Sequence, residues 1–166
     1  MLEDLLERDL RLVVCGTAAG DRSARLGLYY AGRGNKFWRV LAEVGLTPRQ
    51  LAPVEYLLLP SFGIGLTDLV KGQSGQDSAI RFSPSDPSPL QKKILRFQPR
   101  VFCFNGKRAA TEFFHTRDVA YGVHSHHIGA TRLFVAPSTS GAANGSWDIA
   151  FWQQLAEIVQ SHALMG

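Results

Sequence analysis

The sequence is poor in cysteine and has no long hydrophobic run, and each absence excludes a class of protein. Cys15 and Cys103 are the only cysteines, which excludes a disulfide framework and a metal site built on CxxC pairs. Each lies inside an apolar run, LVVCG or VFCFN, so we expect reduced, buried thiols. No apolar run approaches the roughly 18 residues of a membrane helix, and the acidic start MLEDLLERDLR lacks the apolar core of a signal peptide. We therefore expect a cytoplasmic protein with no membrane partner.

The remaining composition is that of an ordinary globular protein. The 166 residues fit a single domain spanning residues 1–166. Hydrophobic residues make up 45% and charged residues 19% of the chain, a balance without the signature of disorder. The net charge of +4 is compatible with a polyanionic partner, but many proteins that bind no nucleic acid are equally basic. The charge alone therefore does not indicate DNA.

Alternating strands and helices are predicted along the chain. Three short apolar runs bounded by Gly, Asn or Pro predict buried strands at residues 12–15, 101–104 and 133–136. Helices are predicted at residues 35–44, 88–97, 106–114 and 146–163, with capping boxes at 47–50 and 88–91. Residues 71–89, rich in Gly, Ser, Asp and Pro, predict a surface loop. The fold class is therefore α/β, a single three-layer domain with a central, mainly parallel sheet flanked by helices.

Small and polar residues follow the predicted strands, at the edge where such sheets bind ligands. The first strand runs into GTAAGDRS at residues 16–23, and the third into PSTSGAANG at residues 137–145. Between them, GIGLTD at residues 63–68 ends in a carboxylate. Small residues let backbone N–H groups approach a flat or anionic ligand. GTAAG matches neither a Walker loop nor GxGxxG, so this loop alone indicates little.

Taken together, these segments resemble a known family. The block from LRLVVCGTAAG to GNKFWRVL is similar to the N-terminal motif region of mismatch-specific uracil-DNA and thymine-DNA glycosylases, in the uracil-DNA glycosylase superfamily. In that group a strand runs into G-I-N-P-G, followed by S-A, an aromatic residue and N-[KR]-F-W. GIGLTDLV resembles the family's G-[IVL]-T-[ND]-L-V segment, and APSTSGA stands where the family has its wedge loop. The resemblance runs in order from Leu10 to Ala142.

The departures from the family pattern bear on the chemistry. Members with G-I-N-P-G use the Asn to hold the attacking water, and this chain has Ala18 at that position. The resemblance implies that Asp68, the carboxylate of G-L-T-D, takes over as the catalytic residue, as in other members that lack the Asn. The wedge loop is also altered, because Ser138 replaces the usual Asn, and Ala142-Ala143-Asn144 replaces a bulkier intercalating side chain.

The resemblance also implies roles for the other motif residues. Tyr30 would stack on the flipped base, backbone groups of Thr17 and Tyr30 would read it, and Ser23 would line the pocket near the pyrimidine C5. The predicted base pocket consists of Gly16, Thr17, Ala18, Ser23, Tyr30 and Ser138. The predicted DNA-binding residues are Ser140, Gly141, Ala142, Ala143 and Asn144, with Arg22, Arg25, Arg33 and Lys36 as candidate phosphate contacts. We expect a monomer with no cofactor and no metal. Because no pocket segment contains a lysine, we also expect no strand-nicking lyase activity.

Other interpretations of these residues stay open. Asp68 could cap a helix, and Asp21 is the rival carboxylate. Tyr30 could be a core residue, with Tyr29 as its alternate, and Asn35 is interpreted as bracing the loops. The run His124-Ser125-His126-His127 lacks nearby Cys or carboxylate partners, so we interpret it as a surface strand or an element at the edge of the DNA rather than a metal site.

The sequence is compatible with three functions. The first is a monofunctional DNA glycosylase that hydrolyses the N-glycosidic bond of uracil, and of related damaged or mismatched bases, to start base excision repair. The second is a protein of the same fold that binds damaged DNA without cutting it. The third, independent of the resemblance, is an α/β protein that binds nucleotides or phosphate esters through GTAAG.

Overall fold

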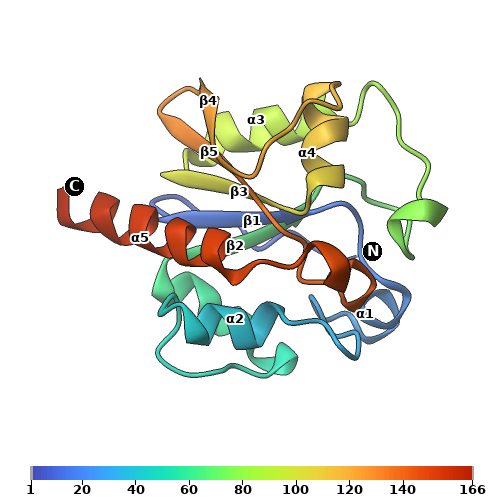
Figure 1. Ribbon diagram of the computed structural model, residues 1–166, viewed down its shortest axis with the longest axis horizontal. Helices are drawn as coiled ribbons and strands as arrows, with labels where there is room; N and C mark the ends of the chain where they lie inside the picture. Colours follow the sequence, from blue (N-terminus) through green and yellow to red (C-terminus); the bar gives the residue numbers. More distant parts are fainter. Residues whose placement is uncertain (1, 166) are drawn as a thin grey trace.

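The computed structural model describes residues 2–165. These residues contain a five-stranded sheet with the strand order β2-β1-β3-β5-β4. β1 (Leu12–Gly16), β2 (Ile64–Asp68), β3 (Val101–Asn105) and β5 (Thr131–Ala136) are parallel, and β4 (Gly122–Ile128) pairs antiparallel with β5 at one edge. The sheet runs through the middle of the molecule (Figure 1).

Helices cover both faces of this sheet. α2 (Phe37–Glu43) and α5 (Ile149–Met165) lie on one side, and α3 (Pro87–Phe97) and α4 (Lys107–Phe114) lie on the other (Figure 1). The packing of β1 on both faces explains why its sequence is a continuous apolar run. Leu12 and Val14 belong to the core with α2 and α5, whereas Val13 and Cys15 belong to the core with α3 and α4. Burial of alternate side chains on opposite faces is typical of a covered parallel strand, and the predicted fold class is confirmed.

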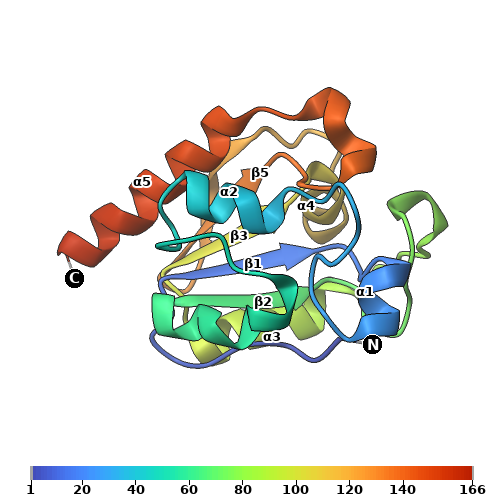
Figure 2. The same cartoon turned by 90° about the horizontal axis from the view of Figure 1, so that it is seen from below.

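The short helical elements gather where the parallel strands end. Figure 2 shows α1 (Asp21–Leu26), the 3₁₀ turn η3 (Gly141–Ser146) and the loop that contains η2 (Asp77–Ala79) beyond the tip of β1. A longer 3₁₀ helix, η1 (Pro53–Phe62), leads into β2. The loops predicted to bind ligand therefore converge at one edge of the sheet.

Two strands lie outside the three apolar runs. β4 is the surface strand inferred for the histidine run, and that interpretation is confirmed. β2 was expected only as a segment ending in a carboxylate. Its Gly65 lies so close to the N-terminal segment that an added Cβ would meet the Leu5 carbonyl at 2.5 Å. Leu5 and Leu66 exchange two backbone hydrogen bonds of 2.9 Å. Because Gly65 has no side chain, the N-terminal segment can approach β2 closely enough to form them.

Both predicted capping boxes are wrong. α3 begins at Pro87, before Ser88, because proline at the first helical position needs no N–H partner. Thr47 caps no helix, because η1 begins only at Pro53, and the Thr47 hydroxyl donates to the carbonyl of Arg49 at 2.9 Å instead. α5 begins three residues later than predicted, because the Asp148 carboxylate accepts from the N–H of Ala150 at 3.0 Å and caps it there.

Cys15 and Cys103 are free and fully buried, as predicted. Burial raises the pKa of both thiols, so they stay protonated at neutral pH. Within residues 2–165, no helix combines the length and the apolar character that crossing a membrane requires.

Candidate active site

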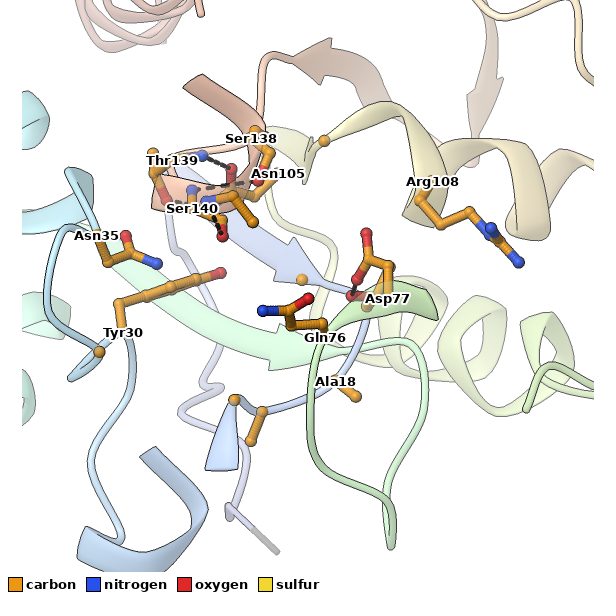
Figure 3. Close-up of a pocket in the computed structure, with 18 of the residues that line it drawn as sticks. Ala18, Tyr30, Asn35, Gln76, Asp77, Asn105, Arg108, Ser138, Thr139 and Ser140 are labelled. Carbon is orange, nitrogen blue, oxygen red and sulfur yellow. Dashed lines mark hydrogen bonds between the residues drawn. The ribbon is translucent and has the colours of Figure 1, made fainter. Parts of the chain in front are cut away.

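A cavity of about 670 Å³ opens at the carboxyl ends of β1, β2 and β3. This volume lies within the roughly 300–1,000 Å³ of small-molecule sites. Figure 3 shows residues from four separate loops pointing into it. The lining draws on residues 16–21, 29–30, 75–78, 105–108 and 138–140, with Leu2, Ser23, Gly32, Asn35, Asp68, Tyr121, Ala142, Ala143 and Ser146.

The structure brings together all of the predicted pocket residues. Asp68 and the six predicted base-pocket residues line this one cavity: Gly16, Thr17, Ala18, Ser23, Tyr30 and Ser138. Of the five predicted DNA-binding residues, Ser140, Ala142 and Ala143 also line it, whereas Gly141 and Asn144 lie outside the lining. Segments from both ends of the chain, from Leu2 to Ser146, thus contribute to one site.

Asp68 is the last residue of β2 and lies beside Gly16 in the register of the sheet. Its side chain is 5% exposed. A Cβ added to Gly16 would stand 2.8 Å from Asp68 Oδ1 and 3.3 Å from the Tyr30 hydroxyl, so glycine leaves the room that these two groups occupy. No helix begins at Asp68, and the helix-cap alternative is therefore wrong.

Burial dominates the electrostatics of Asp68. It raises the pKa of the carboxyl group, and Lys71, whose Nζ lies 3.6 Å from Oδ2, offsets part of that shift. A buried carboxylate with a perturbed pKa in a cleft is the kind of group found at catalytic sites.

Tyr30 forms one wall of the cavity. Its ring stacks on that of Phe37, with centroids 4.1 Å apart and an interplanar angle of 27°. The residue adopts a left-handed backbone conformation, with φ of 52°. Among the described residues, its buried hydroxyl forms no hydrogen bond of good geometry. Burial and the nearby Asp68 raise its pKa, so the hydroxyl stays protonated, although the Asn105 side chain lies near enough to lower the pKa slightly.

The loop after β2 was predicted to be a surface loop, but part of it is bound to the loop after β1. Thr17 Oγ1 donates to Asp77 Oδ1 at 2.5 Å, and Ser74 Oγ donates to Asp21 Oδ1 at 2.9 Å. The backbone N–H of Gly75 also donates to the carbonyl of Ala19 at 2.9 Å. Asp21 is exposed and already accepts a hydrogen bond, which makes it a weaker candidate for the base than the buried Asp68.

The loop after β5 is also held in place. Asn105 Nδ2 donates to Thr139 Oγ1, and Thr139 N donates to Asn105 Oδ1, both at 3.0 Å and both buried. Residues Gly141–Ser146 of this loop form the 3₁₀ turn η3, which is capped by the Ser140 hydroxyl. The side-chain oxygen of Asn144, a predicted DNA-binding residue, accepts a hydrogen bond from the Lys36 ammonium group.

Polar residues that were not predicted also line the cavity: Gln76, Asp77, Asn105, Lys107 and Arg108. Asn105 and the start of α4 follow a parallel strand, so the rule that located the other loops could have identified them. The expectation that no lysine lies in the pocket is wrong. Lys107 lines it, with Nζ 4.4 Å from the centre of the Tyr121 ring.

The remaining candidates are placed as follows. Asn35 lines the cavity and accepts a hydrogen bond from the N–H of Phe37, consistent with a bracing role. Arg22, Arg25 and Arg33 are exposed and lie outside the lining. His124 stacks on Phe114, with ring centroids 4.1 Å apart, away from the cavity. Within residues 2–165, no cluster of three or more His, Cys, Asp or Glu is arranged to hold a metal ion.

The fold and the cavity define an α/β protein with a cavity of small and polar residues at the carboxyl edge of its sheet. The family model described as the uracil DNA glycosylase superfamily matches residues 3–156. The chain therefore belongs to the uracil DNA glycosylase superfamily. The fold is similar to the solution NMR structure of a candidate uracil DNA glycosylase from Methanosarcina acetivorans, with a TM-score of 0.66 and 22% identity over 96% of each chain.

Proposed function

We propose that this protein is a monofunctional DNA glycosylase of the mismatch-specific branch, which hydrolyses the N-glycosidic bond of uracil and of related damaged or mismatched bases in DNA. The observation that supports it best is the position of Asp68, a buried carboxylate in the same cavity as Tyr30. Superfamily membership supports the reaction class, and the order of the sequence motifs supports the branch.

The chemistry begins with access to the sugar. The C1′ atom is shielded in a stacked duplex, so the nucleotide is extruded into the cavity at a cost of a few kcal/mol, which is lowest for mismatched bases. The ring face of Tyr30 that does not pack on Phe37 stacks on the base. The Asn105–Thr139 pair keeps Ser138 at the cavity wall, where its hydroxyl accepts from the N–H of Ser140 at 3.2 Å and can donate to the base edge.

Asp68 then serves two purposes. As the N1–C1′ bond breaks, its negative charge stabilises the positive charge that develops on the sugar. Water attacks C1′, Asp68 accepts the proton that the water loses, and uracil leaves as an anion with the electron pair of the broken bond. Ala18 has no polar side chain to hold the water, so this role also falls to Asp68.

DNA would approach from the mouth of the cavity. Ala142 and Ala143 lie there on η3, Ser140 precedes them as its cap, and Arg108 lines the same opening from α4. Because η3 presents small side chains, it fills little of the gap left by an extruded base. Phosphate contacts from the cations at this edge would make binding strongly dependent on salt.

We predict that the protein, assayed in EDTA, releases free uracil from a uracil-containing oligonucleotide and leaves an intact abasic strand. The strand should break only after alkali treatment. Lys107 is the lysine of the cavity that could form a Schiff base, but its ammonium group lies over the Tyr121 ring. A product trapped by borohydride would contradict the monofunctional assignment, and Lys107→Met would show whether this residue is responsible.

Ala18 supports a second candidate function, a reader that binds damaged DNA without cutting it. The two candidates differ in one observable, because the reader binds uracil-DNA but releases no base. Binding and excision measured on the same oligonucleotide separate them.

Tyr30→Ala is expected to slow excision by removing a stacking surface worth about 1–3 kcal/mol per base, a decrease of about 5- to 150-fold in kcat/KM. Tyr30→Phe retains the ring and removes a buried hydroxyl that forms no hydrogen bond of good geometry, so it should be tolerated. The test compares kcat/KM of the two variants on one uracil substrate. Equal activity of both variants and the wild type would mean that Tyr30 only packs the core.

A further inference from the structure

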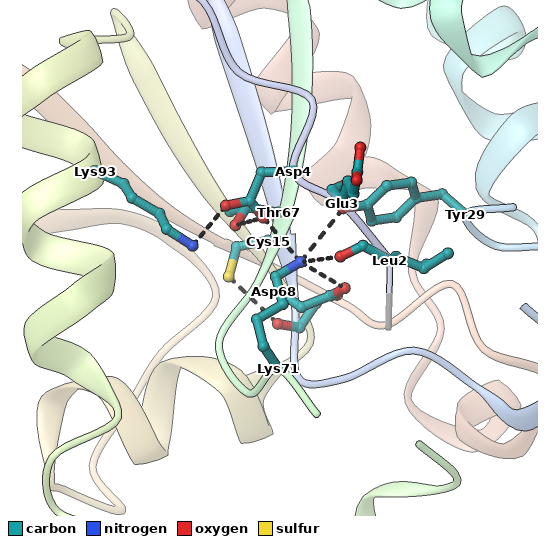
Figure 4. A network of polar contacts seen from close by, with 10 residues as sticks. Leu2, Glu3, Asp4, Cys15, Tyr29, Thr67, Asp68, Lys71 and Lys93 are labelled. Atoms are coloured by element: carbon teal, nitrogen blue, oxygen red, sulfur yellow. Dashed lines mark hydrogen bonds and ion pairs between the residues drawn. The ribbon is translucent and has the colours of Figure 1, made fainter. Parts of the chain in front are cut away.

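Four charged side chains next to the cavity form a row of alternating sign (Figure 4). Lys93 Nζ lies 2.5 Å from Asp4 Oδ2, and Asp4 Oδ1 lies 2.8 Å from Lys71 Nζ. Lys71 Nζ in turn lies 3.6 Å from Asp68 Oδ2. The row contains two ammonium groups and two carboxylates, so it is neutral as a whole, and its most buried member is Asp68.

Lys71 is held in this row from several sides. Its ammonium group donates to the carbonyl of Leu2 at 3.1 Å and to the Tyr29 hydroxyl at 3.5 Å. Thr67 Oγ1 donates to Asp4 Oδ1 at 2.7 Å and so orients the carboxylate between the two lysines. The side chain of Lys71 is 24% exposed, and these contacts fix its charge beside Asp68.

This contact matters because a general base must be ionised at the working pH. Burial opposes ionisation of Asp68, and Asp4 adds a like charge. Lys71 is the one cation within 4 Å of Asp68 among the described residues. Lys93, on α3, contributes a weaker attraction from farther away.

The other titratable groups that face Asp68 are uncharged. Tyr29, Tyr30 and Cys15 interact with it, and burial raises the pKa of each. All three stay protonated at neutral pH, so none supplies a positive charge. Lys71 is therefore the main group that favours the carboxylate form.

We propose that Lys71, held by Asp4 and the N-terminal segment, is a positioning residue that keeps Asp68 ionised. This inference rests on the proposed role of Asp68 as the base. An opposite charge at this distance lowers a carboxyl pKa by about 1–3 units. Loss of the Lys71 charge should therefore shift the acid limb of the pH–rate profile upward by at least about one unit.

The experiment records the single-turnover rate of uracil excision against pH for the wild type and Lys71→Met. On the acid limb, the variant should be about tenfold slower or more, and it should approach the wild-type rate at high pH. Lys71→Arg, which keeps the charge, should restore most of the profile. Lys71→Gln, which still can donate to the Leu2 carbonyl, replaces Lys71→Met if the latter does not fold.

Lys93→Met is the matched control. It removes an ion pair with Asp4 but no contact with Asp68, so its acid limb should move far less. A carbon-13 NMR titration of the Asp68 carboxyl group gives a readout that does not depend on activity, and its midpoint should rise in Lys71→Met.

An unchanged midpoint, or a rate lowered equally at every pH, would overturn the proposal. The role of Asp68 as the base fails separately, if Asp68→Asn excises uracil at nearly the wild-type rate, and the proposed function fails if the wild type releases no uracil. In either case the NMR midpoint alone tests whether Lys71 controls the ionisation of Asp68.

Discussion

Asp68→Asn should lower the single-turnover rate of uracil excision by about 10²–10⁴-fold, the usual contribution of a general base. Asparagine keeps the shape of the side chain but accepts no proton from water. DNA binding should survive, because removing a negative charge near a polyanion does not weaken attraction. Quenched-flow rates at saturating enzyme, with binding measured on the same oligonucleotide, provide the test.

The same substitution should not destabilise the protein at neutral pH. Because burial raises the pKa of Asp68 in the folded state, ionisation of this group opposes folding once the pH exceeds its unfolded value of 3.8. Asp68→Asn should therefore have an equal or higher free energy of unfolding at pH 7, and the difference should vanish below that pKa. Urea denaturation at the two pH values measures this, and a less stable variant at pH 7 would contradict it.

A side chain restored at position 18 provides a further check of the mechanism. In the Asp68→Ala background, Ala18→Asn returns the water-holding amide of the family motif, and part of the lost rate should recover. If Asp68→Ala itself cuts at nearly the wild-type rate, the carboxylate is not the base. Asp21 would be the next carboxylate to test, although it is exposed and bound to Ser74.

Gly16→Ala should have the second largest effect, a decrease in the excision rate of about 10²-fold. The new Cβ would lie 2.8 Å from Asp68 Oδ1 and 3.3 Å from the Tyr30 hydroxyl. At least one of these groups must move, and a misplacement of about 1 Å is enough for such a loss. Because β1 and β2 pair at this point, the backbone cannot easily shift to make room.

Gly20→Ala is the matched control. It makes the same change four residues later, in the loop that follows β1, but nothing lies within 4 Å of its added Cβ. Its excision rate and its thermal stability should stay close to wild type. Comparable losses in both variants would show that crowding of Asp68 and Tyr30 by the new Cβ is not what slows Gly16→Ala.

The fold could be predicted from the sequence because its parallel strands are buried on both faces. The runs that became β1, β3 and β5 are continuously apolar and are bounded by turn residues. β2 was harder to predict, because Gly65 is needed for contact with Leu5, far away in the sequence. The caps failed for a local reason, since each true helix start is set by an adjacent residue, Pro87 for α3 and Asp148 for α5, that competes with the predicted cap.

The site could be predicted where one strand end supplied one motif, as with Gly16 and Asp68. It could not be predicted where loops are joined through side chains. The hydrogen bond from Thr17 to Asp77 and the pairing of Asn105 with Thr139 connect residues 60 and 34 positions apart. Nothing in the local composition of either segment indicates its partner, and the link between Lys71 and Asp4 was hidden for the same reason.

The most direct test of the account is the amount of free uracil released in EDTA under single-turnover conditions. The wild type should release about one uracil for each bound oligonucleotide, and Asp68→Asn at equal occupancy should release almost none on the same time scale. If the wild type binds the uracil-containing strand but releases no base, the protein is a reader of damage, and the proposed mechanism is wrong.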